Sequence, residues 1–176
     1  MQQKAAEVSM PEEKTLERAR RDEREGESAS TQAGEFVREE MDHIREGKHG
    51  ARSSKQAIAI GLSKARRAGI PLAPPRKGQA SATTREHAER DVARGRKGSP
   101  RPSRTRSRAI SGVLKREAHS AASHRALSRQ AHRSARSRSA ASRSEAAKKA
   151  VRTKGPAERR RAAQKAARTR ARRARR

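Results

Sequence analysis

Residues 53–72 read SSKQAIAIGLSKARRAGIPL and place two isoleucines and a leucine within five residues, which happens nowhere else in the chain. Ser53 and, three residues later, Gln56 fit a capping box at a helix start. Gly69 suits the left-handed position after a helix end, and Pro71 blocks continuation. One side of the helix between these signals holds Ala57, Ile58, Gly61, Leu62, Ala65 and Ala68, with Ile60 at its margin.

A helix with one apolar side needs a partner, and the preceding segment TQAGEFVREEMDHIREGKHG supplies one. Its apolar residues at helical spacing are Phe36, Val37, Met41 and Ile44. Gly47 ends that pattern, and the short connection predicts an antiparallel αα-hairpin over residues 31–70. Gly61 costs about 1 kcal/mol relative to alanine but lets two helices approach closely. A hairpin this small is either marginal alone or stabilised by self-association, and a groove that binds another protein is the alternative interpretation of its apolar residues.

The composition of the whole chain argues against an ordinary domain. Of 176 residues only 30% are hydrophobic, one is Phe, none is Trp or Tyr, and the net charge is +28. Such a chain has too little apolar surface to offset the conformational entropy of folding. We therefore expect a mostly disordered protein, all-α where it folds, with one small αα-hairpin followed by a long basic tail of marginal helices. Without cysteine, a secretory signal or an apolar span, it should be soluble and cytoplasmic, without a membrane role.

Charge divides the chain unevenly. Residues 1–30 carry a net charge of −2, residues 31–70 carry +3, and residues 71–176 carry +27. The first segment interleaves opposite charges at helical spacing, which predicts a charged leader that is disordered or a fraying helix. An alternative for this leader is an autoinhibitory segment that competes with nucleic acid for the basic tail.

The basic part of the chain is divided by proline. Residues 71–105 are rich in Pro, Gly and Ser and predict a flexible linker with a brief helix around residues 84–93. Residues 106–176 form an Arg/Ala/Ser-rich arm with helical tendency. Ala and Arg favour helix at its end, residues 157–176, but the arginines repel one another. We expect this end to be disordered alone and to fold on phosphates.

Three segments carry a resemblance. EFVREEMDHIREGKHGARSSKQAIAIGLSKARRAGIPL resembles the shared segment of a family of small, basic bacterial proteins that have a KQAIAIGLSKARRAG-like run. The segment LKREAHSAASHRALSRQAHRSARSRSAASRSEAAKKAVRTKG is similar to the tails of such proteins, and the end of the chain resembles the basic arms of bacterial linker-histone-like proteins. The resemblance implies a bacterial source and brings no catalytic residues.

The residue types that carry chemistry form no recognised pattern. The six histidines, none of them in an HExxH or Cys/His zinc pattern, are His43, His49, His87, His119, His124 and His132. For His43 and His49 we expect a solvated helix end and loop rather than metal ligands. No GxSxG, GxxxxGK[ST] or GxGxxG motif is present. The sequence therefore predicts no enzyme, no cofactor and no metal site.

The concentration of positive charge predicts a nucleic-acid-binding protein, with DNA and a nucleoid location as the first expectation. Few aromatic rings argue against base stacking and favour phosphate neutralisation without sequence preference. RNA or ribosome binding is one alternative, because SRTRSR and RSARSRSAASRS resemble arginine-serine domains. A protein adaptor tethered by its arm is another. The candidate nucleic-acid-binding residues are Arg101, Arg104, Arg106, Arg108, Lys115, Arg116, Arg133, Arg136, Arg138, Lys148, Lys149, Arg159, Arg160, Arg161, Lys165, Arg168, Arg170, Arg172, Arg173, Arg175 and Arg176.

Overall fold

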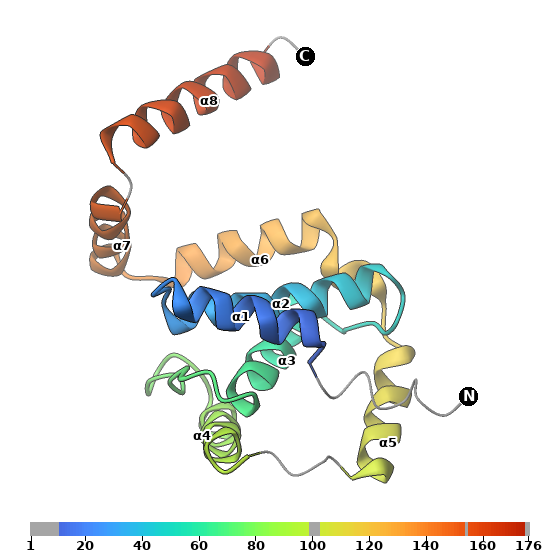
Figure 1. Cartoon of the computed structure of the whole chain (residues 1–176). Coiled ribbons are helices and arrows are strands. Elements are labelled where there is room, and N and C mark those ends of the chain that lie inside the picture. The colour runs from blue at the N-terminus through green and yellow to red at the C-terminus, as the bar shows by residue number, and fades with distance from the viewer. Residues whose placement is uncertain (1–10, 99–102, 154, 175–176) are drawn as a thin grey trace. The chain divides into compact units, whose positions relative to one another are not determined.

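The computed structural model describes residues 11–98, 103–153 and 155–174, and 76% of these residues are helical. Within these ranges there are eight α-helices, one 3-10 helix and no strand (Figure 1). The elements are α1 (Glu13–Arg24), α2 (Ala29–Arg45), α3 (Ser54–Arg67), α4 (Ala82–Arg96), α5 (Arg104–Lys115), η1 (His119–Ala122), α6 (His124–Ser137), α7 (Ala140–Thr153) and α8 (Pro156–Ala174). The chain divides into two compact units, Met1–Gln130 and Ala131–Arg176.

The prediction of a mostly disordered chain with one hairpin and a basic tail is wrong, because ordered helices run through all the described ranges. A prediction from composition assumes that folding needs large apolar side chains. The structure instead buries alanines, whose small side chains let helices pack closely, and several charged groups that bond to one another. The all-α expectation is confirmed for the described residues.

The two helices expected from the apolar run are present as α2 and α3, and they pack against each other. Ser53 Oγ accepts a hydrogen bond from Gln56 N at 3.2 Å, and Gln56 Oε1 accepts one from Arg52 N at 2.8 Å. This is the capping box, with the glutamine reaching one residue further back than usual. Gly47 and Gly69, with φ of 74° and 93°, follow the two helices as the sequence predicts.

Both apolar sides of this helix pair are covered by other parts of the first unit. One buried cluster joins α1 to the pair, and the other joins η1 to it. The first contains Ala19, Ala33, Phe36 and Ala65, flanked by Leu16, Leu62, Ile70 and Leu72. The second contains Met41, Ile44, Ala51, Ala57, Ala121 and Ala122, flanked by Val37, Ile58 and Leu127. Other parts of the same chain therefore cover the hairpin, which the sequence predicts to be either marginal alone or stabilised by self-association.

The charged leader contributes a helix to the fold. Helix α1 lies along α2 (Figure 1), and its Thr15 and Ala19 are buried. Arg18 Nε donates to Glu35 Oε2 at 2.5 Å, an ion pair between the two helices. The backbone N–H of Glu12 donates to Glu39 Oε2 at 3.0 Å just before α1 begins. The interleaved charges of this segment, which suggested a solvated helix, thus include Arg18, whose ion pair with Glu35 joins α1 to α2.

The Pro/Gly/Ser-rich segment contains α4, which includes the brief helix expected there and packs against α3. Ser63 donates a hydrogen bond to Asp91 on α4, and Arg67 Nε lies 3.8 Å from the same carboxylate. Gly95 is in such close contact that an added Cβ would come within 2.1 Å of the Arg66 carbonyl oxygen. This part of the segment is a packed helix rather than a flexible linker.

The start of the basic arm also belongs to the first unit. The loop after α2 forms backbone hydrogen bonds with the start of the arm. Gly50 N donates to Leu114 O at 2.8 Å, and Ala51 N donates to Ala118 O at 3.1 Å. Ser54 Oγ, at the start of α3, donates to Ala121 O at 2.5 Å. These bonds join residues more than sixty positions apart, and sequence periodicity carries no signal for them.

Candidate functional site

The second unit is the most basic part of the chain. Residues 131–176 contain 18 Lys and Arg against two Glu. Its described parts comprise the end of α6, α7 and α8, and almost all their described side chains are exposed. In these described parts the positive charge is therefore largely exposed to solvent.

The structure distributes the predicted nucleic-acid-binding residues over several helices. Helix α5 and its C-cap carry Arg104, Arg106, Arg108, Lys115 and Arg116. Helix α6 carries Arg133 and Arg136, Arg138 follows it, and α7 carries Lys148 and Lys149. Helix α8 carries Arg159, Arg160, Arg161, Lys165, Arg168, Arg170, Arg172 and Arg173. Arg101, Arg175 and Arg176 lie outside the described residues. Since α5 and α8 belong to different units, the set does not form one established site.

Helix α8 brings the largest group of these residues together. Arg161, Lys165, Arg168 and Arg172 recur at intervals of four, three and four, which places them in one row along the helix. Their side chains are exposed. At 1.5 Å per residue the row is about 16 Å long. The opposite side of the helix holds Ala163, Ala167, Ala171 and Ala174, interspersed with Arg160 and Arg170.

Few acidic groups accompany this row. Glu158 lies in the first turn of α8, where a negative charge favours the helix. On α7, Glu145 Oε1 and Lys148 Nζ are 3.2 Å apart, but both side chains are about two-thirds exposed, so water weakens the pair. Like charges four residues apart, such as Arg161 and Lys165, repel one another. An anion bound along the row would relieve that repulsion.

A second group of charged residues lies inside the first unit. Lys64 Nζ, on α3, lies 3.0 Å from Glu39 Oε1 and 2.5 Å from Glu40 Oε1, both on α2. All three side chains are at most 1% exposed. Buried charges are tolerated when they are paired in this way, and each loses its compensation if a partner is removed. We call Glu39, Glu40 and Lys64, with the two histidines described next, the buried polar cluster.

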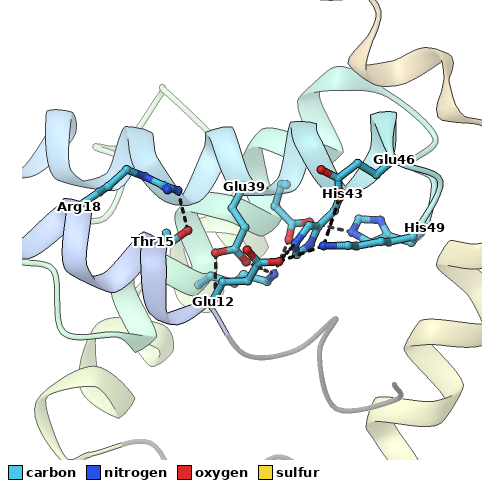
Figure 2. A network of polar contacts seen from close by, with 10 residues as sticks. Glu12, Thr15, Arg18, Glu39, His43, Glu46 and His49 are labelled. Atoms are coloured by element: carbon cyan, nitrogen blue, oxygen red, sulfur yellow. Dashed lines mark hydrogen bonds and ion pairs between the residues drawn. The ribbon is translucent and has the colours of Figure 1, made fainter. Parts of the chain in front are cut away.

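Two histidines, His43 and His49, extend the cluster, and Figure 2 shows both beside its carboxylates. His43, 3% exposed, places Nε2 2.7 Å from Glu12 Oε1, and Lys48 Nζ lies 3.0 Å from the same oxygen. These two hydrogen bonds, first that of His43, lower the pKa of Glu12 from 4.5 to about 2. The hydrogen bond between Lys48 and Glu12 in turn raises the pKa of Lys48. His49 is fully buried, and its Nε2 lies 3.5 Å from Glu40 Oε2.

The prediction that His43 and His49 are solvated is wrong. His43 faces Glu12, and the turn at Gly47 returns the chain so that His49 meets α2. The sequence signal for this cluster was the spacing of Glu40 and His43, three apart and therefore on one side of a helix. Patterns such as HExxH and Cys/His pairs do not include that spacing.

Comparisons with known protein families, curated proteins and solved structures give no match to this chain. The resemblance to small basic bacterial proteins and to linker-histone-like arms thus stays a prediction. None of the helices in the described ranges is long and apolar enough to cross a membrane.

Proposed function

We propose that the protein binds duplex DNA through its second unit, without sequence preference, by neutralising backbone phosphates. The observation that carries the proposal is the row formed by Arg161, Lys165, Arg168 and Arg172 on α8, exposed and with one carboxylate on the same helix. Each phosphate neutralised by such a cation releases a condensed counterion, which drives binding at low salt. In a bacterial cell this activity corresponds to a nucleoid-associated protein.

The expected lack of sequence preference follows from the residue types that the protein exposes to DNA. Base readout requires side chains held rigidly against base edges, and base stacking requires exposed aromatic rings. The chain's single Phe, Phe36, is fully buried in the first unit. The cations of α8 alternate with alanines on an exposed helix and are not held rigidly by neighbouring side chains. The remaining chemistry is attraction between guanidinium or ammonium groups and phosphates.

RNA or ribosome binding and an adaptor role remain the alternatives. The same cations attract RNA phosphates, so RNA is a competitor in every binding measurement. The adaptor alternative needs a partner-binding surface on α2 and α3, and the apolar sides of that pair are covered by α1 and η1. This favours direct nucleic-acid binding over capture of a protein by the hairpin.

The test is a set of charge substitutions in the full chain. Replacing Arg161, Lys165, Arg168 and Arg172 with glutamine keeps helix-forming side chains but removes four charges. The matched control replaces four exposed arginines of the first unit, Arg20, Arg21, Arg24 and Arg38. We expect the α8 variant to reduce the slope of log affinity against log salt by up to about 3.6 on duplex DNA, and the control to change it much less. Equal losses in the two variants would reject α8 as the interface, and tighter binding to RNA than to DNA would favour the RNA alternative.

A further inference from the structure

The backbone brings Glu40, His43 and His49 to one place in the first unit. Glu40 and His43 lie three residues apart on α2, so they share a side of that helix. His49 follows the left-handed turn at Gly47, where the chain reverses, and its side chain lies against Glu40 of α2. All three side chains are buried, and one ligand atom from each lies within 4.8 Å of the others. Two imidazoles and a carboxylate are a ligand set that zinc enzymes use.

The polar atoms of His49 and Glu40 indicate that something belongs between them. His49 Nδ1 lies 3.1 Å from the Gly50 carbonyl oxygen, which can only accept, so Nδ1 carries the proton. In the neutral ring Nε2 then presents a lone pair, 3.5 Å from Glu40 Oε2. Among the residues that the structure describes, neither Nε2 nor Oε2 has a hydrogen-bond partner, although both atoms are buried. Two acceptors facing each other in a dry site require a cation or a proton between them.

The separation of these two atoms favours a metal over a proton. A charged imidazolium donating to a carboxylate lies about 2.7–2.9 Å from it. Two ligands of one tetrahedral zinc ion, each bonded at 2.0–2.1 Å, lie about 3.3 Å apart. The observed 3.5 Å is close to the second value and too long for the first. One edge of a coordination sphere is therefore already set, and His43 must approach by less than about 1.5 Å to complete it.

Groups around the site match those that orient metal-binding histidines. A metal-bound histidine commonly donates its second ring N–H to a carboxylate or a backbone carbonyl. His49 does so to the Gly50 carbonyl. His43 Nε2 lies 2.7 Å from the Glu12 carboxylate, which leaves Nδ1 with its lone pair when Nε2 donates.

The charge of the surrounding network favours a bound cation. The ion-paired carboxylates are those of Glu12, Glu39, Glu40 and Glu46, and the ammonium groups that meet them are those of Lys48 and Lys64. Glu12, Glu46 and Lys48 are about half exposed, so water screens their charges. Among the buried groups, two carboxylates meet one ammonium group, and a cation bound at Glu40 would offset the remaining negative charge.

We propose that Glu40, His43 and His49 bind one divalent transition-metal ion, with Zn(II) as the ion that fits imidazole and carboxylate ligands best. The ion would tie the loop after α2 to that helix. Since this loop also holds residues 114–118 through Gly50 and Ala51, the metal would stabilise the first unit as a whole. The proposal is independent of DNA binding, which rests on the second unit.

The test titrates the full chain, stripped of metal with a chelator, with Co(II) and then with Zn(II). We expect one equivalent of Co(II) to produce the visible d–d absorption of a four- or five-coordinate site, and one equivalent of Zn(II) to remove it. Zn(II) should also raise the Tm of the protein. A wild-type chain that gives neither the absorption nor the rise in Tm would overturn the proposal.

Variants separate this site from surface histidines. His49→Ala should lose the absorption and weaken binding at least tenfold, whereas His132→Ala, an exposed histidine on α6, should retain both. Circular dichroism without metal shows whether each variant is folded, and Glu40→Gln serves if His49→Ala is not. X-ray absorption of the zinc-loaded wild-type protein should show two imidazole ligands, whatever the variants do. Unchanged one-to-one binding by a folded His49→Ala, or a spectrum without two imidazoles, would refute the assignment.

Discussion

The backbones of α3 and α2 meet at Gly61 and Val37. A Cβ added to Gly61 would come within 2.7 Å of the Val37 Cα and 2.9 Å of its nitrogen. Backbone atoms cannot rotate away as a flexible side chain can, so any side chain at position 61 has to push the two helices apart. The glycine that weakens α3 as an isolated helix is thus what allows it to pack.

Gly61→Ala should therefore destabilise the protein, although alanine is the better helix former. We expect overpacking to lower the free energy of unfolding by about 1–3 kcal/mol. The matched control is Gly34→Ala on α2, where an added Cβ has nothing within 4 Å. That change should stabilise the protein by about 0.5–1 kcal/mol. Urea denaturation measures both; stabilisation by the two changes alike would contradict the close approach.

Lys64 should be essential to the first unit, because it is the ammonium group that meets both Glu39 and Glu40. Lys64→Met preserves the length of the side chain but leaves two carboxylates buried without that cation. We expect the free energy of unfolding to fall by about 3–5 kcal/mol. Lys55→Met, an exposed lysine on the same helix, is the control and should change it little. Equal small effects would show that water, rather than Lys64, compensates the carboxylates.

Acid should remove the stabilisation that Glu12 provides. Its pKa is about 2 in the folded protein against an ordinary 4.5, so the ionised form is favoured by folding. The contribution is complete above pH 4.5 and is lost as the pH falls from there toward 2. In metal-free buffer, wild type should be more stable than Glu12→Gln at about pH 6, and the difference should shrink in this range. A difference that does not change with pH would disprove the pairing with His43 and Lys48.

Local signals in the sequence were sufficient for the α2–α3 pair. A cap at Ser53, a stop at Gly69 and two matching apolar sides are all set by residues a few positions apart. The charge of the second unit is likewise a property of composition, so a count of Lys and Arg along the chain was enough to name its residues as candidates.

The long-range contacts could not be predicted in this way. Ala121 and Ala122 are buried against residues more than sixty positions earlier, and alanine alone does not distinguish a core from an exposed helix. Lys64, Glu39 and Glu40 have the residue types of ordinary surface charges until α2 and α3 are brought together. The buried polar cluster depends on how α2 and α3 pack. A count of apolar residues therefore underestimates how much of the chain is folded.

Binding of DNA by the second unit through phosphate neutralisation is tested most directly by the salt dependence of binding of the wild-type chain to two duplexes of unrelated sequence. We expect equal affinities and a common slope of log affinity against log salt steeper than about −3.6, the contribution of the row on α8 alone. A slope near zero, or a strong preference for one of the two sequences, would contradict this mechanism.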